Sequence, residues 1–229
     1  MCGRYTLATI QEQLAEEFDL IEVESLRPRY NIAPTQSVPV VRVLGDNSTR
    51  RLEELRWGLV PHWAKDPSVG SRMINARSEE AATKPSFRVP LRRQRCLVPS
   101  TGFFEWKVGG DADSRRTKKQ PYYFRRRDER VFAFAGMWDR WVGADGKPIE
   151  TYTILTTSPN ELIRSFHDRM PVIVARDQYG LWLDPTVQDV DRLRPLFDPF
   201  PAGDMVAYPV STHVNAPAHD DAECIRTIR

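Results

Sequence analysis

Cysteine is scarce in this chain of 229 residues, which has only Cys2, Cys96 and Cys224. The number is odd and no two of them have Cys-x-x-Cys spacing, which argues against a disulfide framework and against a structural zinc site. The four histidines also lack the His-x-His or His-x-x-x-His spacing that is typical of a metal centre. We therefore expect free thiols, no metal and no cofactor.

Long apolar stretches and linkers are missing as well. No run approaches the roughly 18 to 20 apolar residues that a membrane helix needs, and residues 1–7 lack the apolar core of a signal peptide. No repeat, low-complexity tract or Gly/Ser-rich linker divides the chain. We expect a single domain over residues 1–229, a monomer located in the cytoplasm and, in a bacterium, at the nucleoid. The segment after about residue 215 shows no informative motif.

The net charge of +2 conceals an uneven distribution of charge. Residues 72–130 contain 16 Lys or Arg and 7 Asp or Glu, a net charge of +9, whereas the rest of the chain has a net charge of −7. Arginine outnumbers lysine 27 to 6, and a guanidinium matches phosphate oxygens better than an ammonium does. This basic segment suits a phosphate-bearing partner, although a solvated charged face has the same composition.

Strands dominate the predicted secondary structure. Hydrophobic residues make up 41% of the chain and the mean hydropathy is −0.50, as in an ordinary globular protein. Runs of β-branched and aromatic residues predict strands at 38–43, 52–59, 96–98, 103–106, 122–125, 131–138, 151–156, 172–174 and 205–210. This pattern indicates an α+β domain on a curved, barrel-like, mostly antiparallel β-sheet with a few flanking helices.

Two helices and one long loop complete the expected organisation. Thr9 and Glu12 form a capping box for a helix that continues to Phe18. Ser158, followed by a proline, predicts the start of a second helix that ends just before His167. Residues 108–120 are rich in Gly, Asp, Ser and Lys and predict an exposed hairpin loop.

Cys2 is the first candidate for chemistry. Methionine before a small residue is normally removed, which would leave Cys2 with an α-amine of pKa ~7.7 to 8.0 and a thiol of pKa ~8.5. With an aldehyde, the amine can form a Schiff base and the thiol can then close onto the imine carbon to give a thiazolidine. The amine can instead act as a base for its own thiol, as in N-terminal nucleophile hydrolases. A small buried structural cysteine is the plain alternative.

Two titratable residues are candidates for proton transfer. Glu105 lies between Phe104 and Trp106, and apolar rings around a carboxylate raise its pKa toward a useful range. Strand alternation leaves an outward-facing Glu105 as the alternative. His167, at the exit of the second predicted helix, can act as a general acid or base, or merely satisfy the last helix carbonyls.

Polar and aromatic residues that could bind a nucleic acid form a third group. Asn75 could orient a carbonyl or a hydroxyl group, and Arg77 could hold a phosphate, although a turn asparagine and a solvated arginine fit equally well. Trp57, Trp63 and Trp106 offer flat surfaces on which bases could stack, worth ~1 to 3 kcal/mol per base when exposed. Tryptophan is, however, more often a core residue.

Six motifs occur in order along the chain. They are Cys2-Gly3-Arg4-Tyr5, Arg29 to Pro34, Trp57 to Pro61, Asn75 to Glu79, Arg95 to Pro99 with Gly102 to Trp106, and His167 to Pro171. Together they resemble the motif series of the SRAP (SOS response-associated peptidase) domain family from residue 2 to about 215. One departure is Ala64 after Trp63, where the family has a second aromatic residue.

The resemblance implies a role in the response to DNA damage. Members of that family bind single-stranded DNA and crosslink the mature N-terminal cysteine to the ring-opened aldehyde of an abasic site, which shields the lesion. By this resemblance Cys2 is the nucleophile and Asn75 positions its amine or the sugar. Glu105 then shuttles protons, and His167 assists protonation of the sugar oxygen and the reverse, lyase-type reaction.

The resemblance also implies a DNA-binding surface and a proteolytic step. It implies that Arg4 and Arg77 hold phosphates, that Trp63 and Trp106 lie near the DNA, and that a peptidase activity removes Met1. Two other functions stay open from the residues alone. One is an N-terminal-nucleophile cysteine peptidase or amidase without a DNA role, and the other is a non-catalytic binder of single strands whose cysteine is structural.

Overall fold

The computed structural model describes residues 2–24, 26–43, 49–108 and 119–228. Within these residues the strands are β1 (Tyr5–Leu7), β2 (Arg29–Ile32), β3 (Ser37–Val43), β4 (Arg50–Trp57), β5 (Asn75–Arg77), β6 (Arg95–Ser100), β7 (Gly102–Val108), β8 (Lys119–Arg126), β9 (Phe132–Val142), β10 (Pro148–Thr157), β11 (Met170–Pro171), β12 (Ile173–Val174) and β13 (Met205–Pro209). The α-helices are α1 (Gln11–Phe18), α2 (Ser78–Ala81), α3 (Arg88–Arg93) and α4 (Tyr179–Leu183). The short 3₁₀ helices are η2 (Pro67–Arg72), η3 (Ile163–Ser165), η4 (Arg176–Gln178), η5 (Val190–Arg192), η6 (Arg194–Phe197), η7 (Ala202–Asp204), η8 (Thr212–Asn215) and η9 (Ala222–Ile225).

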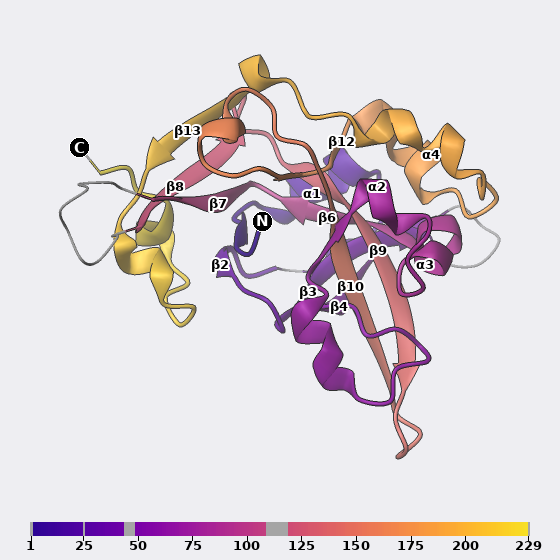
Figure 1. The fold of residues 1–229 in the computed structure, drawn as a ribbon. Helices are drawn as coiled ribbons and strands as arrows, with labels where there is room; N and C mark the ends of the chain where they lie inside the picture. The colour runs from indigo at the N-terminus through magenta and orange to yellow at the C-terminus, as the bar shows by residue number, and fades with distance from the viewer. Residues whose placement is uncertain (1, 25, 44–48, 109–118, 229) are drawn as a thin grey trace.

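Five strands of the larger sheet close on themselves. Strand β4 pairs with β3, β3 with β6, β6 with β9, β9 with β10, and β10 returns to β4 in a parallel pairing. The long β9–β10 hairpin projects from one end of this barrel (Figure 1). The smaller sheet has the antiparallel order β13-β8-β7-β1-β2. The expected α+β fold on a curved, mostly antiparallel sheet is therefore confirmed.

All the predicted strands form, but the helix predictions are only partly right. Helix α1 begins after Ile10, and the Thr9 hydroxyl donates to the Gln13 side chain instead of capping the helix, so the predicted capping box is wrong. Residues 158–166 contain only the turn η3, so the predicted second helix is also wrong. Asn160 explains this turn, because its Oδ1 accepts from the N–H of Ile163 and its Nδ2 donates to the Phe200 carbonyl.

The predicted hairpin loop is supported by the strands on either side of it. Strands β7 and β8 pair in antiparallel register from Val108 opposite Lys119 to Phe103 opposite Phe124. Residues 109–118 of the loop lie outside the described residues. No helix in the part of the chain that the structure describes is long and apolar enough to cross a membrane.

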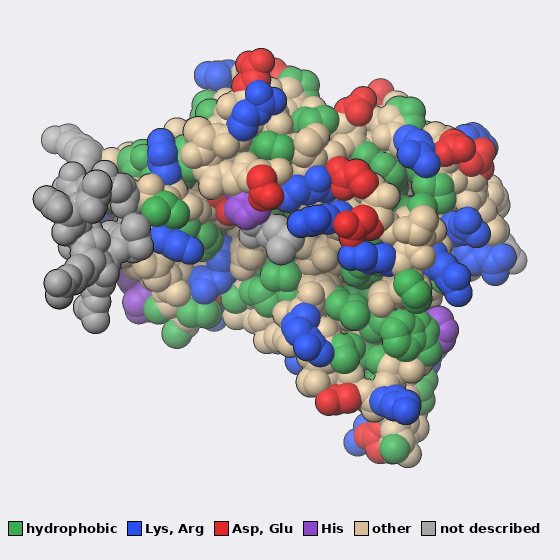
Figure 2. Space-filling model, viewed as in Figure 1, with side chains coloured by type: hydrophobic (Ala, Val, Ile, Leu, Met, Phe, Trp, Pro, Cys, Tyr) green, Lys and Arg blue, Asp and Glu red, His purple; other side chains and the backbone are tan. Residues whose placement is uncertain are grey.

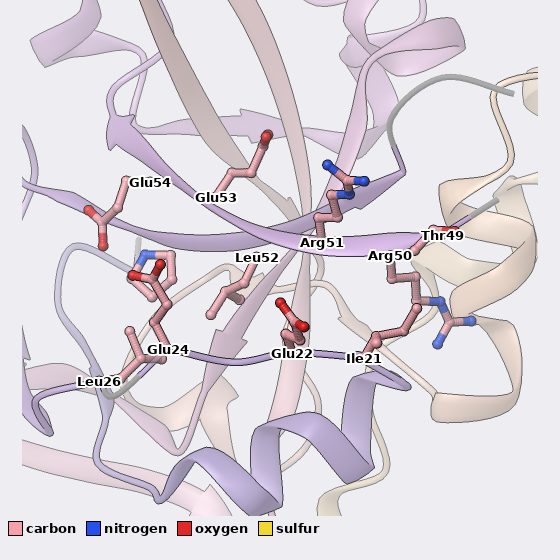
Figure 3. Close-up of a pocket in the computed structure, with 11 residues that line it drawn as sticks. Ile21, Glu22, Glu24, Leu26, Thr49, Arg50, Arg51, Leu52, Glu53 and Glu54 are labelled. Carbon is pink, nitrogen blue, oxygen red and sulfur yellow. The ribbon is translucent and has the colours of Figure 1, made fainter. Parts of the chain in front are cut away.

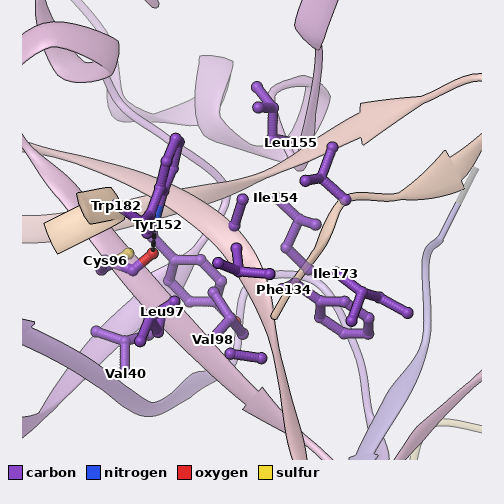
Figure 4. Packing of buried hydrophobic residues seen from close by; sticks show 14 of the residues in the cluster. Val40, Cys96, Leu97, Val98, Phe134, Tyr152, Ile154, Leu155, Ile173 and Trp182 are labelled. Carbon is purple, nitrogen blue, oxygen red and sulfur yellow. Dashed lines mark hydrogen bonds between the residues drawn. The ribbon is translucent and has the colours of Figure 1, made fainter. Parts of the chain in front are cut away.

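The barrel interior is filled by apolar side chains from β3, β6, β9 and β10 (Figure 4). The indole of Trp182 in α4 covers one end and donates a 2.8 Å hydrogen bond to the Cys96 carbonyl. Phe134 of β9 packs edge-on against Tyr5 of β1 and Phe103 of β7, with ring centroids 5.8 and 5.9 Å apart. Fully burying a side chain of this size contributes roughly 1.5 to 3 kcal/mol. These contacts hold β1 against the barrel.

A close backbone approach fixes the path from the barrel to β5. Gly58 has a φ of +122°, and a Cβ built on it would lie 2.6 Å from the carbonyl oxygen of Gly70. A Cβ on Gly70 would lie 2.5 Å from the carbonyl oxygen of Gly58. Only glycine fits at both positions, and the pair directs the chain into β5, which lies beside β10 with Asn75 opposite Ile154.

Candidate active site at the N-terminal cysteine

Cys2 lies three residues before Tyr5, the first residue of β1, and is fully buried. Tyr5 pairs with Phe103, and this register brings the start of the chain alongside Glu105 on β7. Burial raises the pKa of the Cys2 thiol well above its usual range, and the charge of Glu105 raises it further. The thiol is therefore protonated at neutral pH, and it needs a base before it can attack.

Asn75 is in direct contact with Cys2. Its Nδ2 donates a 2.8 Å hydrogen bond to the Cys2 carbonyl. Among the described residues its Oδ1 is buried and has no hydrogen-bond partner. An unpaired buried acceptor is costly, so its presence beside the first residues of the chain indicates a place for a donor such as an amine or a hydroxyl group.

Glu105 combines burial with an altered acidity. The residue is only 4% exposed, so the outward-facing alternative is wrong. Burial raises the pKa of Glu105 from the ordinary 4.5 to about 7. A carboxyl group with this pKa can both accept and donate a proton near neutral pH, which is what a proton shuttle requires.

His167 follows η3, and the N–H of Arg169 donates a 3.0 Å hydrogen bond to its Nδ1. Burial lowers the pKa of His167, which favours the neutral ring. The Asp168 carboxylate lies 2.7 Å from Nδ1, but its side chain is 79% exposed and water screens its charge.

Two contacts fix the loop that carries His167. The ring of Phe166 packs on Tyr122 and Phe124 of β8, with centroids 4.8 and 5.0 Å apart. On the other side, Arg169 forms two hydrogen bonds of 2.8 and 2.7 Å with the Glu79 carboxylate. Since Glu79 lies in α2, just after β5, this ion pair ties the His167 loop to the strand that carries Asn75.

An open cavity of about 520 Å³ lies at Glu105 and His167, and we refer to it as the Cys2 cavity because the charge of Glu105 in its wall acts on Cys2. It is lined by Glu105, Trp106, Lys119, His167 and Asn215. The Trp106 indole donates a 2.8 Å hydrogen bond to Asn215 Oδ1, so the C-terminal segment forms one wall. The volume is within the usual range for a pocket that binds a small ligand.

The four predicted catalytic residues thus lie together although they come from four distant segments. Asn75 contacts Cys2, the charge of Glu105 acts on Cys2, and Glu105 and His167 line one cavity. The structure adds Lys119 and Asn215, to which sequence reasoning gave no catalytic or binding role. Asn215, with Val210 and Ser211, resembles the closing segment of the family, but only the fold reveals that Asn215 and Lys119 line the cavity.

Arg4 is mainly engaged within the protein. One terminal nitrogen, Nη1, donates to Asn31 Oδ1 at 2.7 Å and to the Val214 carbonyl at 2.8 Å. The other, Nη2, donates to the Asn215 carbonyl at 3.4 Å. Arg4 therefore binds the C-terminal wall of the cavity, and a phosphate could use only its remaining N–H groups.

The other predicted DNA-binding residues differ in position. Trp106 lines the cavity, whereas Trp63 is 54% exposed and is not among the lining residues. Arg77 follows Asn75 on β5, and its side chain is 55% exposed and 3.7 Å from Glu80. Figure 2 shows further Lys and Arg side chains spread over this face, with Asp and Glu among them. The net positive charge of the middle segment is therefore partly balanced locally.

A second hollow of similar size, about 490 Å³, lies along β4 (Figure 3). It is lined by residues 21, 22, 24, 26, 39 and 49–54. Arg50 pairs with Asp19 at 2.7 Å, and Glu53 pairs with Arg42. No cysteine or histidine is among the lining residues.

Comparisons of sequence identify relatives of this chain. A family model described as SOS response associated peptidase (SRAP) matches residues 1–217. The abasic site processing protein YoqW of Bacillus subtilis (strain 168) is 42% identical over 230 residues, covering 99% of this chain and 100% of the relative. The abasic site processing protein HMCES of Gallus gallus is 35% identical over 233 residues, covering 87% of this chain and 66% of the relative.

Solved structures share the fold. A crystal structure of a protein from Bacteroides thetaiotaomicron has a TM-score of 0.85 and 28% sequence identity, and covers 100% of both chains. A phage-related protein from Bordetella bronchiseptica has a TM-score of 0.72 and 28% identity, covering 91% of this chain and 94% of that chain.

Proposed function

This chain belongs to the SRAP family, and we propose that it processes abasic sites in single-stranded DNA through a covalent crosslink to Cys2. The crosslink shields the lesion during the response to DNA damage. Relatives that match almost the whole chain are named abasic site processing proteins, which supports the substrate. One observation carries the proposed chemistry: the fully buried Cys2 contacts Asn75, whose buried Oδ1 has no partner among the described residues, and the buried Glu105 lies close enough for its charge to act on the thiol.

The first step is removal of Met1 by hydrolysis of the Met1–Cys2 peptide bond. Water is consumed, and the bond breaks to give free methionine and the α-amine of Cys2. Only this amine can form an imine, because the nitrogen of an internal cysteine is an amide. The peptidase activity in the family description supports such self-processing.

Schiff-base formation follows. The Cys2 amine attacks C1 of the ring-opened abasic sugar, and Asn75 Oδ1 accepts a hydrogen bond from this amine, which satisfies the buried acceptor. Protonated Glu105 then donates a proton to the departing hydroxyl group, so that one water leaves and the protonated imine forms. The His167 ring, which lines the cavity, donates a hydrogen bond to the sugar oxygen.

Ring closure completes the crosslink. The Glu105 carboxylate takes the proton from the Cys2 thiol as sulfur attacks the carbon of the protonated imine, which leaves a neutral ring nitrogen and restores protonated Glu105. The amine, the thiol and the aldehyde thereby become a thiazolidine and one water, with no change of oxidation state. Because a neutral buried thiol attacks poorly, the reaction depends on Glu105. The same groups in reverse order would open the ring and release the DNA.

An abasic site presents no base edge, so contacts to the DNA backbone must hold the strand. In this proposal the DNA strand contacts Lys119 and Trp106, which lie in the cavity wall. Arg77, at the end of β5, holds a phosphate. Salt weakens such contacts, with a log–log slope of about −0.7 per phosphate for a single strand.

A gel assay tests the proposed function. The purified protein is incubated with a single-stranded oligonucleotide that carries one abasic site and is then run on a denaturing gel. We expect a shifted band for the natural protein and none for Cys2→Ala. Cys2→Ser keeps the amine and loses the thiol, so it should give a shifted band only after borohydride reduction of the imine.

Controls separate this function from its alternatives. Intact mass must show that Met1 is absent from all three proteins. A natural protein that has lost Met1 and still gives no covalent band would contradict the proposal. A band that persists unchanged in Cys2→Ala would place the nucleophile on another residue.

A further inference from the structure

The C-terminal segment contains a cluster of potential metal ligands that the proposed function does not use. The ligand atoms of His213, Asp221 and Cys224 all lie within 4.8 Å of one another. No other group of three or more such residues is found in the described ranges. His213 lies in η8 and Cys224 in η9, and Asp221 directly precedes η9. Asp221 and Cys224 lie beyond the residues that the family model matches.

We propose that His213, Asp221 and Cys224 bind one Zn²⁺ ion, with water in the fourth position. An imidazole nitrogen, a carboxylate oxygen and a thiolate form a ligand set that suits zinc, whereas Ca²⁺ and Mg²⁺ prefer oxygen alone. The side chains of His213 and Asp221 are 31% and 54% exposed, so the ion can enter from solvent. On binding, the Cys224 thiol gives its proton to the buffer.

The distances fit this ion with small side-chain rotations. Bond lengths of about 2.0 to 2.3 Å place two ligand atoms of a tetrahedral zinc site about 3.4 to 3.6 Å apart. His213 Nε2 and Asp221 Oδ2 are already 3.1 Å apart. The widest separation in the cluster, at most 4.8 Å, must close by about 1 Å, which χ rotation of a short side chain can provide.

Each of the three side chains is held in place by a further contact. Asp221 Oδ1 accepts from the N–H of Glu223 at 3.0 Å, which leaves Oδ2 for the ion. The His213 ring stacks on the His219 ring, with centroids 3.8 Å apart and planes 6° apart. Cys224 is fully buried, and its thiol donates a 3.4 Å hydrogen bond to the His219 carbonyl. Such supporting contacts are typical of built metal sites.

A bound zinc ion would stabilise the C-terminal wall of the Cys2 cavity. Asn215, which holds Trp106, follows His213 by two residues in η8. Asn31 on β2 donates to the Val214 and His219 carbonyls at 3.1 and 2.6 Å and so connects the same segment to the smaller sheet. Bound zinc would join η8 to η9 and stabilise this wall without contacting the reacting atoms.

Sequence spacing does not reveal this cluster. The ligands are separated by seven and by two residues, which matches none of the common zinc patterns. The expectation of no metal rested on that spacing. The contact between η8 and η9 brings the three side chains together, and this depends on contacts of the segment with β2.

Zinc titration of the full chain tests the proposal. All proteins carry Cys2→Ala, because a terminal aminothiol is itself a zinc chelator. Isothermal titration with ZnCl₂ should show one site per chain. Cys224→Ser and Asp221→Asn should each weaken the affinity at least about 100-fold, since loss of even an outer partner costs up to that factor.

A matched pair elsewhere in the molecule provides the control. His62 Nδ1 lies 3.1 Å from Asp139, the same distance as in the His213–Asp221 pair, but it belongs to no such cluster. His62→Ala should therefore leave the zinc affinity within about twofold of the parent. Substitution of Co²⁺ should give a thiolate-to-cobalt charge-transfer band that Cys224→Ser removes.

Two results would overturn the proposal. One is the absence of saturable zinc binding by the folded parent protein. The other is binding that Asp221→Asn and Cys224→Ser both leave within twofold. Asp221→Asn is the decisive variant if Cys224→Ser does not fold, because asparagine can keep the capping bond to Glu223. Since Cys2 is absent throughout, neither result depends on the crosslinking chemistry.

Discussion

The cavity at Cys2 and the hollow along β4 have nearly equal volumes but different contents. The first gathers residues from β7, β8, the His167 loop and the C-terminal segment, with a buried carboxyl group of raised pKa among them. The second is formed chiefly by residues 21, 22, 24 and 26 and by residues 49–54, and its Arg50 and Glu53 form ion pairs with Asp19 and Arg42.

The difference shows that volume alone does not mark a reactive site in this protein. Burial also raises the pKa of Glu54 in the β4 hollow, yet no cysteine or histidine lies beside it. At the Cys2 cavity, a raised pKa coincides with a thiol, an unpaired amide oxygen and a neutral imidazole. Chemistry is therefore expected where distant segments bring complementary groups together.

Replacing one glutamate in each hollow should give the largest difference in crosslinking rate between the two hollows. Glu105→Gln should slow crosslink formation by about 10²- to 10⁴-fold, the usual contribution of general acid–base catalysis. Glu54→Gln in the β4 hollow should leave the rate within about twofold. The measurement is the initial rate of the shifted band under excess abasic DNA, and equal rates for the two variants would remove the role of Glu105.

Stability should depend on pH through Glu105. Its pKa is about 7 in the folded protein and 4.5 in the unfolded chain, so the folded protein binds more protons between these values. The free energy of unfolding should therefore fall by about 3 kcal/mol as the pH rises from 4.5 to 7, and stay constant above. Urea unfolding at pH 5 and 8 should show this fall in the natural protein and a smaller one in Glu105→Gln. An equal change in the free energy of unfolding between pH 5 and 8 in both proteins would contradict this role of Glu105.

Breaking the ion pair between Arg169 and Glu79 should have an effect of intermediate size on stability and on crosslinking. Arg169→Ala removes two hydrogen bonds to Glu79 and one to the Thr156 carbonyl, so it should lower the free energy of unfolding by about 1 to 3 kcal/mol. It should also slow crosslinking, because the Arg169 side chain ties the His167 loop to β5. Arg50→Ala, which breaks the pair with Asp19 at the other hollow, should leave the crosslinking rate unchanged.

The smallest effect is expected for loss of a single phosphate contact, which changes the salt dependence of DNA binding. If Arg77 contacts a phosphate, Arg77→Ala lowers the log–log salt slope of non-covalent single-strand binding by about 0.7. Arg51→Ala at the β4 hollow should not change the slope. Fluorescence anisotropy with an intact oligonucleotide measures both, and an unchanged slope in Arg77→Ala would remove this residue from the DNA path.

Local patterns were sufficient to predict most of the strands and the candidate catalytic residues. Apolar runs identify strands such as β3 and β9, and the motifs around Cys2, Asn75, Glu105 and His167 point to the residues that meet in the fold. The short strands β1, β2 and β5 were not predicted, because three or four residues carry too little periodicity.

Long-range contacts account for what could not be predicted. The side-chain bonds of Asn160 override the helix signal after Ser158. Arg4 binds carbonyl groups 210 and 211 residues away, so its place in the cavity wall follows from tertiary structure alone. Asn215 likewise joins the cavity wall through a tertiary contact, because its side chain accepts a hydrogen bond from Trp106.

Peptide mapping of the crosslink by mass spectrometry tests the central claim most directly. The natural protein is reacted with an abasic oligonucleotide, digested with a nuclease and a protease, and the modified peptide is sequenced. We expect the sugar remnant on a peptide that begins at Cys2, with a mass equal to peptide plus aldehyde minus one water, and resistant to borohydride. A remnant on a lysine, or on a peptide that still begins with Met1, would contradict the account.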